Sequence, residues 1–133
     1  MIAGVADTHT VLWYLYADAR ISNTAKGFID QASATRKKIA VSSISVAEVV
    51  YLIEKNRLAS PAYDVVTEAL DDPDHVFTEA VLNAAIVRSM RSVSRAEVPE
   101  MPDRIVAATA VYFDVPVITR DSRILASSIK TVW

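Results

Sequence analysis

Four acidic residues lie close to the predicted starts of helices, and their side chains could share one site. They are Asp7, Glu48, Asp103 and Asp121. Apolar runs that read as buried strands come shortly before Asp7, Glu48 and Asp121, whereas a loop precedes Asp103. Because the carboxyl ends of parallel strands meet at one edge of a sheet, we expect these carboxylates to converge.

Carboxylates that converge repel one another, and some take up protons unless a cation neutralises them. Mg²⁺ and Mn²⁺ prefer oxygen ligands, so we interpret all four acids as catalytic residues and as ligands of one of these ions. Such an ion lowers the pKa of water, orients a phosphate and stabilises a leaving oxygen. An all-acid site therefore favours phosphodiester hydrolysis. Thr119, which ends a predicted strand, could support the site by hydrogen bonding to a carboxylate or a water.

Each acid also has a purely structural interpretation. Asp7 and Asp121 could cap the helices that follow them. Ser45 and Glu48 have the spacing of a capping box, and Asp103 lies in a first helical turn, where negative charge suits the helix dipole. Taken together, the four positions favour a shared site over four unrelated caps.

Basic residues accompany the acids. The arginines within two residues of a candidate acid could hold substrate or balance the acids locally; they are Arg104, Arg120 and Arg123. Three further arginines share the outward side of a predicted helix, which is either a solvated surface or a track for a phosphate backbone; they are Arg88, Arg91 and Arg95. His9 and His75 lack the spacing of a zinc site. We expect both histidines at the surface or locally bonded, with His9 pointing away from Asp7.

Composition limits the remaining possibilities. The 133 residues suit one domain over 1–133, and their net charge of −2 is unusual for a protein that binds nucleic acid through bulk electrostatics. With two glycines and no cysteine, the chain has neither a glycine-rich nucleotide loop nor a disulfide or thiolate zinc site. No apolar run approaches the roughly 18 residues of a membrane helix, and no signal peptide is recognisable. We therefore expect a cytoplasmic protein that does not contact a membrane.

Predicted strands and helices alternate along most of the chain. Strands are expected over 2–6, 39–42, 75–78, 115–119 and 129–133. Helices are expected directly after Asp7, from 22 or 23 to 34, from 43 to about 53, over 61–70, 79–93 and 104–113, and briefly from 122. This alternation predicts a single three-layer α/β/α domain with a mainly parallel central sheet.

Four motifs, taken in order, resemble those of the PIN-domain ribonucleases. They are Asp7-Thr8-His9-Thr10-Val11-Leu12-Trp13, Ser43-x-Ser45-x-Ala47-Glu48, Pro102-Asp103-Arg104-Ile105-Val106-Ala107-Ala108-Thr109-Ala110 and Val117-Ile118-Thr119-Arg120-Asp121. Their order, spacing and total length are similar to those of the VapC toxins of toxin–antitoxin pairs. The resemblance implies a PIN-like fold and a Mg²⁺- or Mn²⁺-dependent endoribonuclease whose acidic cluster matches the four acids. It also implies an RNA substrate, a homodimer and inhibition by a cognate antitoxin.

Other families with an acid after the first strand fit less well. A haloacid-dehalogenase-type phosphatase would need a second acid where His9 stands, and a response-regulator receiver domain would need a lysine near Thr119. Two alternatives on the same scaffold stay open. One is a non-catalytic PIN-like binding or assembly module, which would be expected to lose acids that this chain keeps. The other is a non-toxic RNA-processing nuclease, which an adjacent antitoxin gene would distinguish from a toxin.

Overall fold

A five-stranded sheet forms the centre of the computed structural model, which describes residues 1–133. Its strands follow the order β3-β2-β1-β4-β5, and every neighbouring pair is parallel. The strands are β1 (Ile2–Ala6), β2 (Lys38–Ser42), β3 (Phe77–Ala80), β4 (Val117–Ile118) and β5 (Thr131–Val132). The central position of β1 brings its carboxyl end between those of β2 and β4. These are the three strands that precede Asp7, Glu48 and Asp121.

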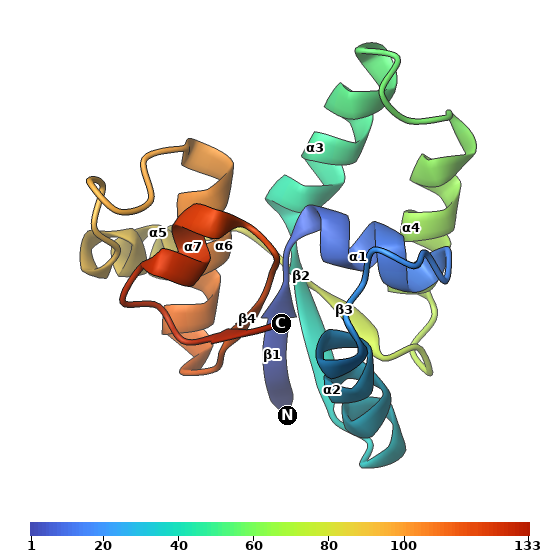
Figure 1. Ribbon diagram of the computed structural model, residues 1–133, viewed down its shortest axis with the longest axis horizontal. Coiled ribbons are helices and arrows are strands. Elements are labelled where there is room, and N and C mark those ends of the chain that lie inside the picture. The colour runs from blue at the N-terminus through green and yellow to red at the C-terminus, as the bar shows by residue number, and fades with distance from the viewer.

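Helices cover both faces of the sheet (Figure 1). They are α1 (Thr8–Leu15), α2 (Asn23–Ala34), α3 (Ser43–Glu54), α4 (Pro61–Asp71), α5 (Ala84–Ser89), α6 (Met101–Phe113) and α7 (Ser122–Ala126), with a 3₁₀ turn, η1, at Met90–Ser92. One core contains buried side chains of α1, α2, α3 and α4, and a second contains those of α5, α6 and α7. The predicted three-layer α/β/α architecture with a parallel sheet is confirmed. No helix is long and apolar enough to cross a membrane.

The strands contribute to both cores because their side chains alternate between the two faces of the sheet. In β2, Ile39 and Val41 belong to the core on the side of α1 and α2, whereas Ala40 belongs to the opposite core. The same alternation separates Val5 from Ala6 in β1. All five side chains are fully buried, which explains why these strands read as continuous apolar runs in the sequence.

The helix expected over 79–93 is wrong at its start. Strand β3 continues through Glu79 and Ala80, which pair with β2, and α5 begins only at Ala84. The side chain of Asn83 caps α5 by accepting a hydrogen bond from the backbone nitrogen of Ile86 at 3.0 Å. The apolar residues from Leu82 onward have helical spacing, and the prediction extended the helix back to Glu79. Glu79 and Ala80 instead pair with β2, and such pairing between distant segments cannot be read from local spacing. For the same reason β3 lies two residues later than the strand expected over 75–78.

Gly4 allows α2 and β4 to approach β1 closely. A Cβ atom at this position would lie 3.0 Å from Cε1 of Phe28 in α2 and 3.3 Å from the carbonyl oxygen of Pro116. Both distances are shorter than ordinary van der Waals contact, and the backbone oxygen cannot move without disturbing the chain that leads into β4. Gly27, in the middle of α2, has no atom within 4 Å of its corresponding Cβ position.

We predict opposite effects of the same substitution at the two glycines. Gly4→Ala should lower the free energy of unfolding by about 1–3 kcal/mol, since the added methyl overpacks the contact with Phe28. Gly27→Ala should raise it by up to about 1 kcal/mol, since alanine is the better helix former. Urea denaturation of both variants measures the two effects. Equal stability of Gly4→Ala and the wild type would contradict the close-approach argument.

Candidate active site

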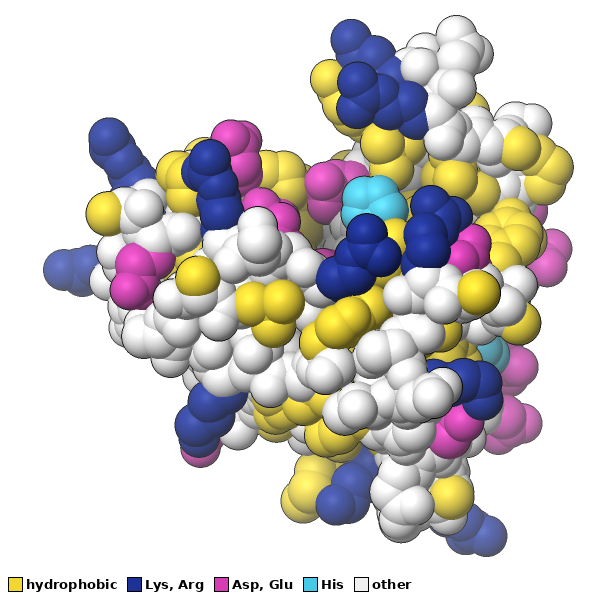
Figure 2. Space-filling model, viewed as in Figure 1, with side chains coloured by type: hydrophobic (Ala, Val, Ile, Leu, Met, Phe, Trp, Pro, Cys, Tyr) yellow, Lys and Arg dark blue, Asp and Glu magenta, His cyan; other side chains and the backbone are white.

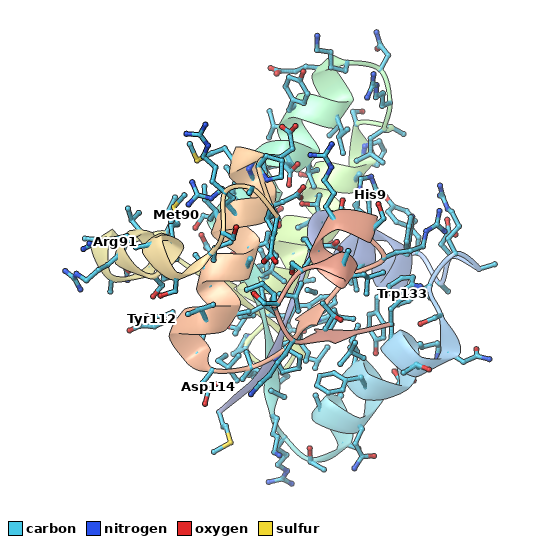
Figure 3. All side chains as sticks on the ribbon, turned by 60° about the vertical axis from the view of Figure 1, so that its left-hand side comes forward. His9, Met90, Arg91, Tyr112, Asp114 and Trp133 are labelled. Atoms are coloured by element: carbon cyan, nitrogen blue, oxygen red, sulfur yellow. The ribbon has the colours of Figure 1, made fainter.

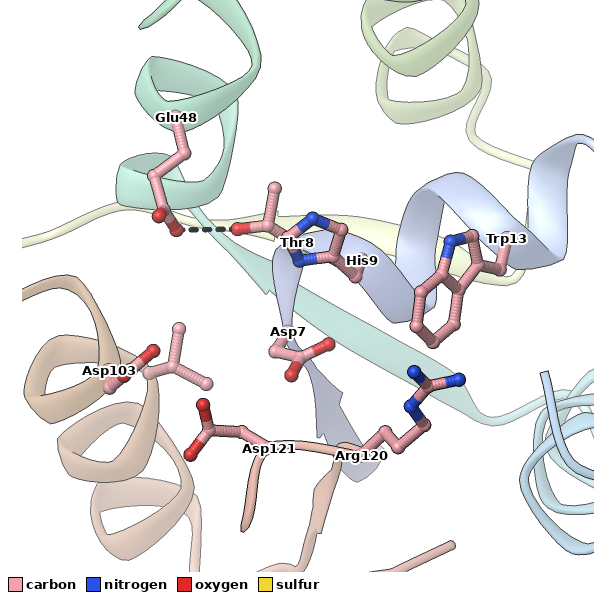
Figure 4. A pocket seen from close by; sticks show the side chains of 9 residues that line it. Asp7, Thr8, His9, Trp13, Glu48, Asp103, Arg120 and Asp121 are labelled. Atoms are coloured by element: carbon pink, nitrogen blue, oxygen red, sulfur yellow. Dashed lines mark hydrogen bonds between the residues drawn. The ribbon is translucent and has the colours of Figure 1, made fainter. Parts of the chain in front are cut away.

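All four predicted acids line one cavity at the carboxyl edge of the sheet (Figure 4). The cavity has a volume of about 360 Å³. Its walls come from α1, α3, α6 and the segment that joins β4 to α7. The lining residues are Asp7, Thr8, His9, Trp13, Glu48, Asp103, Val106, Arg120 and Asp121. The convergence expected from the strand ends is therefore observed, and it includes Asp103, which no strand precedes.

Thr119 connects two of the acids. Its buried hydroxyl donates a hydrogen bond to Oδ2 of Asp7 and accepts one from the backbone nitrogen of Asp121 at 2.9 Å. The other carboxylate oxygen of Asp7 accepts from the backbone nitrogen of Thr10 at 3.0 Å, which caps α1. Asp7 is thus a helix cap and a wall of the cavity at once. The supporting hydrogen bond expected of Thr119 is present.

Asp121 also combines a cap with a place in the cavity. Its Oδ1 atom accepts hydrogen bonds from the backbone nitrogens of Arg123 and Ile124, both at 3.0 Å, at the start of α7. These bonds use one carboxylate oxygen and fix the side chain at the end of β4. Oδ2 accepts no hydrogen bond from the protein.

Glu48 is not part of a capping box. The cap of α3 is Ser42, whose hydroxyl accepts from the backbone nitrogen of Ile44, so Glu48 lies in the second turn of the helix rather than the first. The hydroxyl of Ser45 is buried and has no hydrogen-bond partner. Glu48 is instead held from across the cavity, where Oγ1 of Thr8 donates to its Oε1 at 2.6 Å. The interpretation of Ser45 and Glu48 as a capping box is therefore wrong.

Asp103 experiences the combined charge of the site. It lies in the first turn of α6. Further along the same helix, Ala107, Ala108 and Ala110 are buried against the sheet. The pKa of Asp103 is raised from 3.8 to about 6, mainly by burial and then by the charges of the other acids, Asp121 first among them. No three acidic or histidine side chains are close enough together to form a ligand cluster for a metal ion. The acids line one cavity, but their side chains are too far apart for three of them to bind the same ion directly.

The arginines near the acids have different surroundings. Arg120 lines the cavity. Arg104 does not, because its guanidinium donates to the carbonyl oxygens of Met90 and Val93, at 3.1 and 3.4 Å, and thereby ties η1 to α6. Arg123 lines a separate, shallow depression.

The outward arginine face of α5 and its neighbourhood does not border the cavity either. Arg88, Arg91 and Arg95 are exposed, and none of them is among the lining residues. Figure 3 shows Arg91 at the outer surface, pointing into solvent on the opposite side of the molecule from His9.

Four lining residues were not expected in the site: Thr8, His9, Trp13 and Val106. The expectation that His9 points away from Asp7 is wrong. His9 and Trp13 are four residues apart, so they share one face of α1, and their ring centroids lie 5.6 Å apart. This pair forms one wall of the cavity. The four-residue spacing was visible in the sequence and could have identified both residues.

Comparison with known families identifies the fold. A family model of the PIN domain matches residues 5–128, a range that contains all four acids. The chain belongs to the PIN-domain family. The resemblance drawn from the four sequence motifs is confirmed at the level of the family, and the cavity of this PIN domain brings those motifs together.

Solved structures of similar shape include three bacterial proteins, all below 25% identity to this chain. A chain of VapBC2 from Rickettsia felis, bound to a DNA fragment from its promoter, has 14% identity and a TM-score of 0.70, with 98% of this chain and 97% of that chain covered. A toxin–antitoxin complex from Klebsiella pneumoniae gives 17% identity, a TM-score of 0.64 and coverages of 98% and 97%. FitAcB from Neisseria gonorrhoeae has 21% identity and a TM-score of 0.58, with 98% of this chain and 96% of that chain covered. No curated protein matches the sequence.

We predict that the Thr119 hydroxyl stabilises the fold. Thr119→Val keeps the shape of the side chain but leaves the backbone nitrogen of Asp121 and one oxygen of Asp7 without their partner. The free energy of unfolding should fall by about 1–3 kcal/mol. Thr119→Ser is the matched control, because it keeps the hydroxyl and loses only a methyl group, at a cost of about 1 kcal/mol or less. Urea denaturation that ranks Val as the milder substitution would contradict the role given to the hydroxyl.

We predict that Asp103 makes stability depend on pH. Its pKa is about 6 in the folded protein, against an ordinary value of 3.8. The folded state therefore holds the proton more tightly, and the stabilisation is complete below pH 3.8 and is lost as the pH rises through 6. Asp103→Asn cannot ionise. Between pH 4.5 and 7.5, the free energy of unfolding of Asp103→Asn should therefore rise by about 1 kcal/mol relative to that of the wild type. This value is lower than the full pKa shift would give, because Asp103 is partly exposed to solvent.

Urea denaturation at the two pH values, in EDTA, measures this difference. The matched control is Asp114→Asn, at the opposite end of α6, where the side chain is 93% exposed and lines no part of the cavity. If both variants respond to pH alike, the charge of the cavity is not the cause.

Proposed function

We propose that this PIN domain is a Mg²⁺- or Mn²⁺-dependent endoribonuclease that hydrolyses RNA phosphodiester bonds and acts as the VapC-type toxin of a toxin–antitoxin pair. The observation that carries the proposal is one cavity lined by Asp7, Glu48, Asp103 and Asp121, carboxylates from four separate elements. In this proposal they are the catalytic residues. A non-catalytic binding module would have no use for four acids in one cavity, where burial and then the charges of the neighbouring acids raise the pKa of Asp103.

The donor set fits a hard divalent cation. All four acids offer oxygen ligands. Burial, and then the charges of the neighbouring acids, raise the pKa of Asp103, so the cavity favours a compensating cation. In the proposal Asp7, Glu48, Asp103 and Asp121 hold the ion. Mg²⁺ usually keeps several of its waters, so it does not require every acid as a direct ligand, which agrees with their separation in the cavity. The bound ion supplies positive charge for the attacking water and the leaving oxygen of the phosphodiester.

The protein's own residues prepare the cavity for this chemistry. Thr119 holds Asp7 in place, and Thr8 holds Glu48, so both carboxylates keep their orientation before substrate arrives. Oδ2 of Asp121 is left without a hydrogen-bond donor and is available to the site. Arg120 faces the same cavity and carries the positive charge that a substrate phosphate would meet.

The toxin assignment draws on the structural neighbours. At 14–21% identity they share the fold, and those from Rickettsia felis and Klebsiella pneumoniae are toxin–antitoxin complexes. We extend that partnership to this chain as part of the proposal, with a cognate antitoxin as its inhibitor, a homodimer as the active form and the cytoplasm, where RNA is available, as its place of action.

We predict metal-dependent RNA cleavage that requires the acids. Purified protein with Mg²⁺ or Mn²⁺ should cut members of a panel of structured RNAs, and EDTA should stop the reaction. Asp7→Asn and Asp103→Asn should each lower the cleavage rate by about a hundredfold or more, since each removes a charge from the ion-binding cavity. Gel analysis of end-labelled RNA measures the rates, and circular dichroism checks that the variants fold.

Asp114→Asn is again the matched control and should cleave like the wild type. A thermal shift adds a readout that is independent of activity: Mg²⁺ or Mn²⁺ should raise the Tm of the wild type and of Asp114→Asn more than that of Asp103→Asn. Cleavage that survives in both acid variants, or in EDTA, would rule out the proposed function.

A further inference from the structure

A second cavity adjoins the acidic one. It has a volume of about 490 Å³ and lies between α1 and the loop that joins α3 to α4. His9 and Trp13 line both cavities, so their rings form a ridge between the two. Figure 2 shows this region from outside: basic side chains lie beside a histidine at the border of a hollow that contains acidic groups. Positive and negative charge therefore lie side by side at this ridge.

Two guanidinium groups pack on the indole ring of Trp13. The Cζ atom of Arg20 lies 5.2 Å from the ring centroid, and that of Arg120 lies 5.1 Å from it. A cation at this distance from the face of a tryptophan is attracted by the ring and loses part of its freedom. Figure 4 shows the Arg120 side chain next to Trp13, on the same side of the cavity as Asp7.

The two arginines differ in their ion pairs. Arg20 is paired twice with Asp18, through Nη2 and Oδ2 at 2.8 Å and through Nε and Oδ1 at 3.0 Å. These hydrogen bonds hold the pKa of Asp18 well below its usual range. Arg120 takes part in none of the three ion pairs of the protein. Its neighbour Asp121 does not pair with it either.

We propose that Arg120 binds a phosphate of the RNA strand next to the phosphate that is cleaved, and that Trp13 is the positioning residue that holds Arg120 over the cavity rim. This inference rests on the proposed function and adds a substrate subsite to it. A guanidinium matches two phosphate oxygens at once. Arg120 is exposed, unpaired and oriented in advance, so substrate binding breaks no existing ion pair. Arg20, on the same ring, is already neutralised.

Binding of a single-stranded RNA octamer tests the subsite. The probe carries fluorescein, and anisotropy is measured at several salt concentrations on an Asp7→Asn background, where the probe stays intact. Arg120→Gln should weaken binding about tenfold, the effect of losing hydrogen bonds to a charged group. It should also reduce the slope of log K against log salt by about 0.7, the share of one phosphate on a single strand. Arg20→Gln, the matched control, should change neither quantity.

A double-mutant cycle tests the positioning role. Trp13→Leu should weaken binding when Arg120 is present and have little further effect in the Arg120→Gln protein, because its contribution passes through the arginine. Additive losses would overturn the role of Trp13. Arg120→Gln is an exposed substitution that leaves the core unchanged, so the subsite stays testable even if Trp13→Leu fails to fold.

The outcomes separate the subsite from the nuclease. Equal weakening by Arg120→Gln and Arg20→Gln, or none by Arg120→Gln, would overturn the subsite even if the wild-type protein cleaves RNA. Conversely, binding that depends on Arg120 in a protein that cleaves no RNA would support the subsite and overturn the proposed nuclease.

Discussion

The placement of four carboxylates around one cavity is the constraint on which the site of this PIN domain depends. Asp103 expresses it most directly, because burial and the charges of its neighbours raise its pKa. The other acids are each held by donors that belong to secondary structure. Thr119 at the end of β4 serves Asp7, Thr8 at the start of α1 serves Glu48, and the first turn of α7 serves Asp121. The sheet and its helix starts therefore offset a repulsion that would otherwise push the acids apart.

The strand order determines how closely the acids approach. With β1 between β2 and β4, three strand ends lie next to one another, and the connections to the following helices are very short. Only Asp7 separates β1 from α1, and α3 follows β2 directly. Such connections allow little movement of the side chains at their ends. Asp103 is positioned differently, by a helix whose buried alanines let it pack closely on the sheet.

The sequence predicted those parts of the site that depend on local patterns. An apolar strand followed by an acid and a helix is such a pattern, and it placed Asp7 and Asp121 at the strand ends that border the cavity. Glu48 was harder, because Ser42 and Ser45 both suit a helix cap and only the structure shows that Ser42 caps α3. The boundary of β3 depends on pairing with β2, and the direction of Arg104 depends on carbonyl groups more than ten residues away. Interactions of this kind leave no periodic signal in the sequence.

Under the proposed function, the charge around the cavity affects how the metal ion and the RNA would bind. The chain has a net charge of −2, and the four acids would repel an RNA phosphate as they repel one another. A divalent ion in the cavity would reduce that negative charge and so weaken the repulsion of a phosphate. Under the proposed function the ion and the RNA must therefore strengthen each other's binding, since coupling between two sites is reciprocal. Arg120 is the exception to the negative surroundings. In the proposed subsite, the positive charge of Arg120 does not depend on the ion, so Arg120 could hold a phosphate of the strand before the ion binds.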